Sequence, residues 1–222
     1  MRYDASVART VRSVLIAAFL GHATITAVEQ ITPRLIEEAV SLGQSRIESV
    51  RARYHQPYRQ EISRPPVDYI DVVTPFRQVV LTTEQRTLLG MRGFTQREAA
   101  LALGDRADVI ELRVELTFHP QNVFVGVPAY EVAIAPAPPA ERIPPTRVER
   151  IPRFGARIDA AALPGRPGTP PTPADGGQPV TGGTLIAAFP LARLNPRGRY
   201  EIVVGEAGKE LAKTRVDFAV LR

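Results

Sequence analysis

Residues 110 to 118 alternate strictly between apolar and polar side chains, and this rhythm constrains the fold more than any other feature of the sequence. The apolar positions are Ile110, Leu112, Val114, Leu116 and Phe118, and the polar ones between them are Glu111, Arg113, Glu115 and Thr117. Successive side chains of a β-strand point to opposite faces, so five alternations predict a strand with one buried and one solvent-facing side. The stretch therefore indicates a layered, antiparallel body.

Shorter runs with the same period predict the other strands. They cover 67–73, 123–127 resuming at 130–134, 146–154, 185–189, 199–205 and 210–221. Pro128 interrupts the second of these runs, and because proline cannot donate to a sheet ladder, we expect an edge or a bulge there. The last two runs flank Gly205–Gly208, a tight connection, and so predict a terminal hairpin.

The first helix signal is Thr32-Pro33, because threonine can cap a helix and proline is tolerated in its first turn. An apolar stripe with helical spacing follows as far as Gln56, where Pro57 ends it; its members are Ile36, Val40, Gly43, Ile47, Val50 and Tyr54. The alternative of a coiled-coil seam is weakened by Gly43. We expect one helix that packs within its own domain.

Two further helices are predicted before the strands begin. Thr74-Pro75 repeats the start signal, and the helix is expected to end before Gly90 with four apolar residues on its inner side, namely Phe76, Val79, Val80 and Leu88. Thr95–Glu98 is a capping box, in which each side chain bonds a free amide of the other residue. Gly104 is a natural end for that helix.

Residues 1–27 have the pattern of a secretory signal peptide. Three arginines precede an unbroken apolar run, Val14–Gly21, and small residues follow it. We therefore expect a periplasmic or secreted protein. Two alternatives stay open: a membrane anchor over residues 14–28, which is short of the roughly 20 residues that span a bilayer, and an amphipathic helix packed in a soluble core.

Composition excludes several kinds of chemistry. The chain has 222 residues and no cysteine, so it has no thiol nucleophile, no cysteine-bound metal and no disulfide. The formal net charge of +5 suggests nucleic-acid binding, but arginine supplies all the basic residues except Lys209 and Lys213 and occurs singly or in pairs among glutamates. We interpret this as a compositional bias and expect no nucleic-acid partner.

Proline and glycine mark a long insertion near the C-terminal strands. Residues 135–183 hold 12 of the 21 prolines and 7 of the 16 glycines. Within this range we expect a mobile loop at about 156–183, because the segment contains few apolar residues, and residues 163–183 contain the fewest. The domain organisation expected is thus a signal peptide at 1–27, a mainly helical region at 28–107 and a β-sandwich at 108–222.

Leu191–Tyr200 resembles a segment found before the penultimate strand of immunoglobulin-like and fibronectin-like domains, with the pattern Leu-x-x-Leu-x-Pro-Gly-x-Tyr. Here Arg197 is inserted between the proline and the glycine. The resemblance implies that Tyr200 forms a tyrosine corner, with its hydroxyl bonded to backbone a few residues upstream. It also implies that the strands of the C-terminal part form an immunoglobulin-like sandwich. Together with the predicted helices, we therefore expect an α+β fold in which a helical N-terminal region precedes an antiparallel, immunoglobulin-like β-sandwich with a long Pro/Gly-rich loop.

A search for reactive groups finds no catalytic, cofactor or metal site. No Gly-x-Ser-x-Gly or Gly-x-Gly-x-x-Gly motif occurs. The single imidazole of His119 suits a solvated turn, and the pairs Asp68/Asp71 and Asp105/Asp108 lack the spacing of a calcium loop.

The segment from Phe118 to Tyr130 is the one suggestive of contact with a partner. Its two phenylalanines are expected on opposite faces of adjacent strands and in the core; if Phe124 faces solvent, it is the candidate partner-surface residue.

These features favour an exported, non-catalytic protein that serves binding, scaffolding or assembly in the cell envelope. It would have a protein partner and no cofactor, and would touch the membrane only through an uncleaved N-terminal segment. One alternative is an enzyme that uses carboxylates as acid and base, the available groups being Asp68, Asp71, Glu111 and Glu115. The other is a cytosolic basic protein that binds nucleic acid, which a contiguous arginine face would favour.

Overall fold

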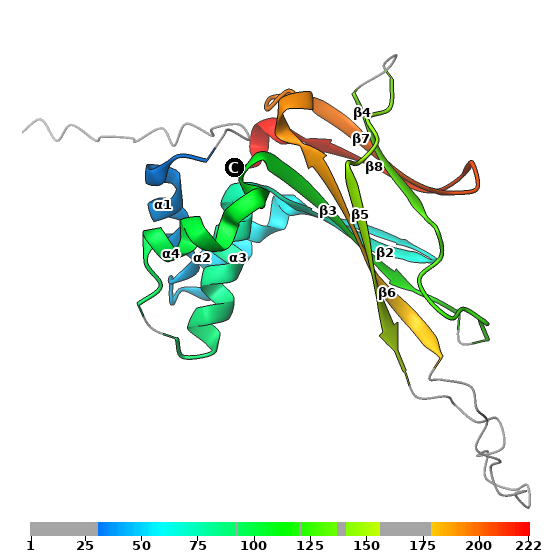
Figure 1. Ribbon diagram of the computed structural model, residues 1–222, viewed down its shortest axis with the longest axis horizontal. Helices are drawn as coiled ribbons and strands as arrows, with labels where there is room; N and C mark the ends of the chain where they lie inside the picture. The colour runs from blue at the N-terminus through cyan, green and yellow to red at the C-terminus, as the bar shows by residue number, and fades with distance from the viewer. Residues whose placement is uncertain (1–30, 92, 120, 137–140, 156–178) are drawn as a thin grey trace, which may run out of the picture.

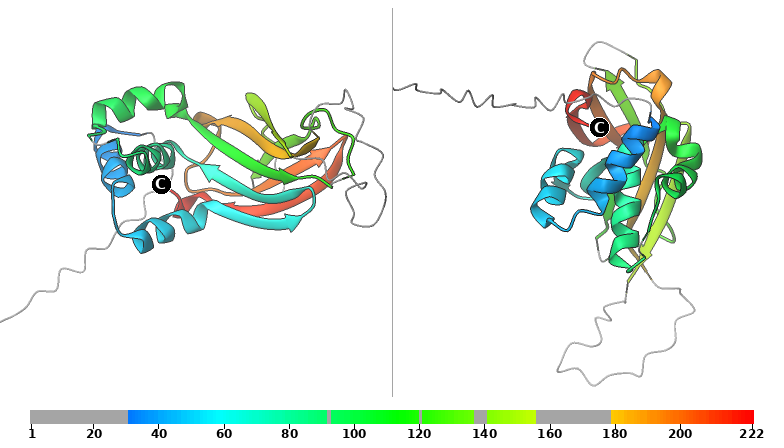
Figure 2. Two further views of the ribbon diagram at one scale, coloured as in Figure 1. Left: turned by 90° about the horizontal axis from the view of Figure 1, so that it is seen from below. Right: turned by 90° about the vertical axis from the view of Figure 1, so that its left-hand side faces the viewer.

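The computed structural model describes residues 31–91, 93–119, 121–136, 141–155 and 179–222. Within them the chain is α+β, with four α-helices at one end of two antiparallel sheets (Figure 1). The strands run lengthwise away from the helices (Figure 2). The signal peptide expected at 1–27 lies outside the described residues.

The larger sheet has five strands in the order β1-β2-β3-β6-β5, all antiparallel to their neighbours. Their bounds are β1 Arg59–Arg64, β2 Val67–Val73, β3 Val109–Thr117, β5 Arg147–Phe154 and β6 Val180–Pro190. The predicted strands at 67–73, 110–118 and 146–154 are confirmed. The strands β1 and β2 fall inside the range 28–107 that was expected to be mainly helical, and β2 pairs directly with β3.

The smaller sheet has three strands, β4 Glu131–Pro136, β7 Arg199–Glu206 and β8 Lys209–Asp217, in the order β4-β7-β8. The predicted terminal hairpin is confirmed, with Ala207 and Gly208 at positive φ in its turn. Strand β8 ends at Asp217 and not at residue 221, because the Asp217 carboxylate caps a single-turn helix at Phe218–Val220 by accepting from the amide of Ala219.

The main hydrophobic core lies between the sheets. The predicted inner residues of β3 are all buried and join those of β2, β4, β6, β7 and β8 in one cluster. The opposite side of β3 is less exposed than the alternation predicts. Glu111 is buried there because Arg113 bonds both the Glu111 carboxylate, at 3.0 Å, and the side chain of Gln78, at 2.8 Å.

The helices are α1 Pro33–Gly43, α2 Glu48–His55, α3 Pro75–Leu88 and α4 Gln96–Leu103. The three predicted caps form: the hydroxyls of Thr32, Thr74 and Thr95 each accept from the amide three residues on, and Glu98 completes the capping box. A second apolar cluster, which includes Ile36, Val40, Phe76, Val80 and Leu103, holds α1, α3 and α4 together.

The single helix expected from Thr32 to Gln56 is wrong. It breaks after Gly43, where the side chain of Gln44 donates to the carbonyl of Phe94 and the hydroxyl of Ser45 accepts from the amide of Ile47. Such local side-chain bonds compete with helical ones. Ile47 and Val50 are consequently exposed instead of lying on the buried stripe.

Arg77 joins the helices to the larger sheet. It is buried in the first turn of α3, donates to the carbonyl of Val72 at 2.6 Å and pairs with Asp71 at 3.2 Å. Its guanidinium also lies 4.8 Å from the ring centre of Tyr58. None of the helices in the described ranges is long and apolar enough to span a bilayer.

The loop expected at about 156–183 is wrong at its C-terminal end, and residues 156–178 lie outside the described part of the chain. Strand β6 begins at Val180 and includes Gly182 and Gly183. These glycines mark a close approach of other chain segments, since a Cβ on Gly183 would lie 2.6 Å from both the carbonyl oxygen of Ile151 and a methyl carbon of Val127.

Candidate partner-binding surface

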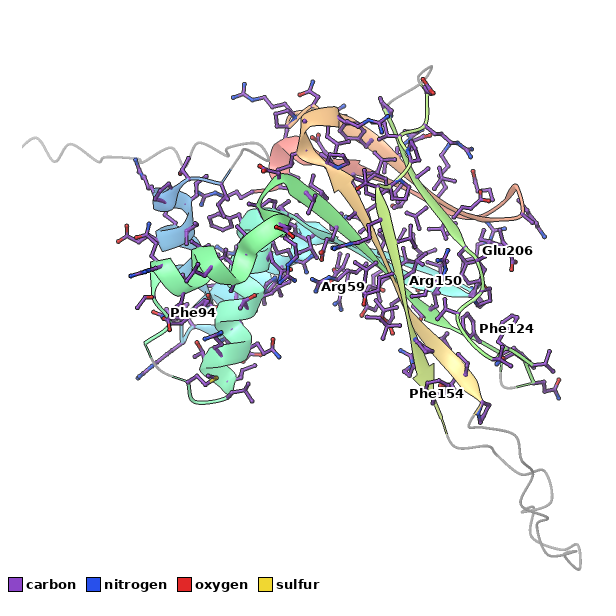
Figure 3. The ribbon with its side chains drawn as sticks, viewed as in Figure 1. Arg59, Phe94, Phe124, Arg150, Phe154 and Glu206 are labelled. Carbon is purple, nitrogen blue, oxygen red and sulfur yellow. The ribbon has the colours of Figure 1, made fainter. Side chains whose placement is uncertain are left out.

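The sandwich has an end away from the helices, which we call the distal end. The strand registers show that three connections lie there, namely the β1–β2 turn, the β3–β4 connection and the β7–β8 turn. The ends of β5 and β6 that flank residues 156–178 lie there too. Figure 3 labels Phe124, Phe154 and Glu206 at this end. Glu131, which follows the β3–β4 connection, pairs with Gly205 beside the β7–β8 turn, so these two connections lie close together.

The β3–β4 connection carries three of the exposed apolar side chains of the distal end, and we call its residues 121–128 the distal loop. Phe154, at the end of β5, is another and is 51% exposed. The strand predicted at 123–127 is wrong, because this loop bonds mainly to itself and to β6. The side-chain amide of Asn122 donates to the carbonyls of His119, at 2.8 Å, and Val180, at 3.0 Å. Its side-chain oxygen accepts from the amide of Phe124 at 2.9 Å.

Phe124 is held from behind by Phe118, contrary to the expectation that both rings are core. The rings meet edge to face at 5.1 Å, and Phe118 is buried whereas Phe124 is 38% exposed. On either side of Phe124, Val123 is 90% and Val125 97% exposed. An anchored loop thus presents three consecutive apolar residues to solvent, which marks a contact surface more than scattered exposed residues would.

A polar network on the adjoining face of the larger sheet stiffens the distal end. Arg153 pairs with Glu115 and donates to the carbonyl of Leu116 at 2.9 Å. The other Glu115 oxygen accepts from Thr184 at 2.8 Å, and Thr117 donates to Asp68 at 2.6 Å. These bonds join strands β2, β3, β5 and β6, so the loop rests on a rigid base.

The four carboxylates considered for acid–base catalysis lie on β2 and β3 of the larger sheet, and each has a partner. Asp71 pairs with Arg59 and Arg77, and Glu111 with Arg113 and Arg147. Asp68 and Glu115 take part in the network just described. An open groove of about 600 Å³ lies instead on the helical body, between α1, α2 and Phe76, and none of the four lines it.

His119 is exposed at the start of the distal loop, where its Nδ1 accepts from the amide of Gln121 at 3.2 Å. Asp105 and Asp108 lie in a short helical turn after α4. Among the described residues, no three histidine, aspartate or glutamate side chains gather in a way that would hold a metal ion.

Tyr200, at the start of β7, makes the backbone contact that the resemblance implies. Its hydroxyl accepts from the amide of Asn195 and donates to the carbonyl of the same residue at 3.3 Å. The inserted Arg197 is accommodated because its amide bonds the side chain of Asn195, while Gly198 bonds the Asn195 carbonyl. A Cβ on Gly198 would lie 2.7 Å from the Tyr200 ring, so glycine is required there.

The sequence singled out Phe124 but missed the valines beside it. The valines alternate with Phe124 and Gly126 as they would in a strand. The signal against a strand was the presence of Gly126 and Pro128, two strand-breaking residues close together.

Comparison of the chain with known protein families, with curated proteins and with solved structures finds no match.

Proposed function

We propose that this chain is an exported, non-catalytic binding protein of the cell envelope, which holds a protein partner at the distal end of its sandwich. The observation that carries the proposal is the almost complete exposure of Val123 and Val125 on a loop that Asn122 and Phe124 fix from behind. Burying an exposed valine gains about 1.5 kcal/mol or more, which the isolated chain forgoes at both positions.

Pre-organisation supports a binding role for the loop. A loop that must become ordered on binding loses part of its affinity to that ordering, whereas a loop already bonded to β6 and packed on Phe118 loses less. Phe124 would form the centre of the contact, because half-exposed aromatic rings with rigid backing are typical anchors of interfaces. The polar network around Arg153 and Glu115 would form part of the rim.

We further propose that the sandwich is immunoglobulin-like, as the resemblance implies. In the immunoglobulin lettering, β2 to β8 take the letters A to G in chain order, and the two sheets then read A-B-E-D and C-F-G, the arrangement of constant-type domains. Strand β1 is an addition before A, and α3 and α4 are inserted between A and B. The Tyr200 corner at the start of the F strand supports the same assignment.

This lettering supports the choice of surface as well. The B–C and F–G loops, which antibodies use among others to bind antigen, correspond to the β3–β4 connection and the β7–β8 turn. Both lie at the distal end. This correspondence is an analogy between folds, whereas the exposure of Val123 and Val125 is the observation on which the proposal rests.

Export is proposed from the sequence of residues 1–27, with the protein periplasmic or secreted. The test is to fractionate cells that make the full chain and to sequence the N-terminus of the recovered protein. A start near Thr24 or Val28 in the soluble envelope fraction supports export. An intact Met1 in the cytosol overturns this part of the proposal.

The binding role is tested by photo-crosslinking in the same cells. A photoreactive residue is placed at Val125 in one variant and, as the matched control, at Val220, which is half-exposed at the opposite end of the sandwich. We expect a discrete crosslinked protein from position 125 and not from position 220, and its loss when Val123→Asp is added. No adduct at 125, or the same adduct at both positions, overturns the partner site.

A further inference from the structure

A second exposed apolar surface lies on the helical body, at the connection between α3 and α4. Leu88 is 80%, Leu89 68% and Met91 53% exposed. Leu88 was expected on the inner side of α3, but α1 ends at Gly43, which packs against Thr83. Residues of α3 beyond Thr83 therefore extend past α1, and the five residues from Glu84 to Leu88 add about 7.5 Å of helix.

One arginine precedes and another follows this connection in the chain, and the nearby carboxylates have partners of their own. Arg86 stacks on Phe94, with its guanidinium carbon 4.4 Å from the ring centre, and Arg97 is exposed in the first turn of α4. Glu84 accepts from His55 at 3.0 Å, and Glu98 forms the Thr95 capping box, which with the charge of Arg86 lowers the pKa of Glu98. The connection therefore combines an apolar end with basic side chains at its base.

The shape of this connection favours a lipid bilayer over a folded protein as its binding partner. Gly90 and Gly93 both have positive φ, which only glycine adopts without strain, and they turn the chain at the end of the helix. The connection thus projects at the edge of the helical body, and in Figure 1 it lies away from the two sheets. A projection needs a matching pocket on a protein, whereas a lipid bilayer accepts it without one.

We propose that Leu88, Leu89 and Met91, which we call the apolar tip, insert into the headgroup region of an anionic lipid bilayer, with Arg86 and Arg97 at the level of the phosphates. Interfacial segments of this kind combine apolar side chains, buried roughly 5–10 Å deep, with basic residues that attract anionic lipids. The proposal concerns a surface separate from the distal end and does not depend on the protein partner proposed there.

The absence of tryptophan from the chain allows a local test. Leu89→Trp places a single indole in the apolar tip, and Val220→Trp places one in the single-turn helix after β8, at a half-exposed position outside the tip, as the matched control. Each purified full-length variant is mixed with vesicles of phosphatidylglycerol and phosphatidylethanolamine, and with vesicles of phosphatidylcholine alone. A local reporter is needed because the apolar run at Val14–Gly21 is itself expected to interact with membranes.

We expect the emission of the indole at position 89 to shift to the blue with anionic vesicles and that at position 220 to stay unchanged. Adding Leu88→Ser and Met91→Ser should lower the apparent affinity about tenfold or more, since most of the inserted apolar area is removed. Adding Arg86→Gln and Arg97→Gln should weaken binding to anionic vesicles and leave the phosphatidylcholine result unchanged.

Three outcomes would overturn the proposal. One is no shift at position 89, and another is an equal shift at positions 89 and 220. The third is a shift at position 89 that exists before vesicles are added and grows with protein concentration, which would indicate that a second copy of the chain covers the tip. Because the assay uses purified protein, its result is independent of whether the chain is exported in cells.

Discussion

The side-chain amide of Asn122 donates to the backbone carbonyl of Val180 at 3.0 Å, although 58 positions separate the two residues. Val180 is the first residue of β6, which lies between β3 and β5 in the larger sheet, so this bond ties the distal loop to an interior strand of that sheet. The same side chain bonds His119 and Phe124. The side-chain amide of Asn122 therefore holds the apolar residues of the distal loop in place.

Replacing this group should loosen the loop without unfolding the sandwich. We expect Asn122→Ala to lower the free energy of unfolding by about 1–2 kcal/mol, the usual cost of losing a few partly buried hydrogen bonds. Amide exchange at Phe124 should become faster, since its acceptor is gone. Denaturation and hydrogen exchange measure the two effects, with Gln121→Ala, an exposed neighbour, as control. Unchanged exchange at Phe124 would argue against the anchoring role.

The two phenylalanines of the distal end should differ sharply in their effect on stability. Phe118→Ala removes a buried ring and is expected to cost about 3–5 kcal/mol. Phe124→Ala removes a ring with only one packed side and should cost about 1 kcal/mol. Urea denaturation of both variants measures the difference. Equal costs would mean that Phe124 belongs to the core and not to the surface.

Two arginines pair with Asp71, and only one should matter for stability. Arg77 is buried and bonds the carbonyl of Val72 as well, so Arg77→Ala leaves buried polar groups unpaired and should cost about 3 kcal/mol. Arg59→Ala removes an exposed partner of the same carboxylate and should cost less than about 1 kcal/mol. Thermal denaturation of the pair separates a structural ion pair from a surface one.

The corner at Tyr200 should contribute through its hydroxyl alone. Tyr200→Phe keeps the packing on Phe218 and removes both contacts with Asn195. We expect a loss of about 1 kcal/mol in the free energy of unfolding. Tyr69→Phe, on the opposite face of the larger sheet, should be close to neutral. A neutral Tyr200→Phe would show that the backbone holds the corner without the hydroxyl.

Stability should decrease with acid, in part through Glu201. Hydrogen bonds from Lys213 and Arg215 hold the pKa of Glu201 below its ordinary value of 4.5. A lowered folded-state pKa stabilises the fold above the ordinary value, and this contribution is lost as the pH falls through the lowered one. Urea midpoints between about pH 5 and pH 3 should therefore fall less steeply in Glu201→Gln than in the parent. Glu210→Gln, on the exposed start of β8, should behave like the parent.

Those parts of the fold that depend on local chemistry are predictable from the sequence. The alternation in β3, the caps at Thr32, Thr74 and Thr95, and the terminal hairpin are all present where the residues indicate them. In each case the deciding interactions connect neighbours in the chain or follow from which face is buried. Strand β1 was missed because a long-range contact decides it. Its residues Arg59–Arg64 are almost all polar and give no strand pattern, and they form a strand because they pair with β2.

The candidate surface was only partly predictable, because long-range bonds decide it. Val123, Phe124 and Val125 alternate with their neighbours as they would in a strand, and nothing nearby signals that Asn122 will bond to β6. The exposure of Leu88 likewise depends on where α1 ends, which depends in turn on the side-chain bonds of Gln44 and Ser45. The sequence indicated Phe124 as a surface candidate, but its contact with Phe118 and its partial exposure are set by the tertiary structure.

Residues at opposite ends of the described chain meet at the junction of helices and sheets. The backbone of Arg222 bonds the hydroxyls of Tyr58 and Thr74, and its guanidinium reaches Glu38 on α1 at 2.6 Å and lowers the pKa of that carboxyl. Synthesis proceeds from the N-terminus, so α1 emerges from the ribosome 184 positions ahead of this partner. The helices consequently receive this tether only after all the described strands have been made, and a chain halted short of residue 222 would leave that tether unformed.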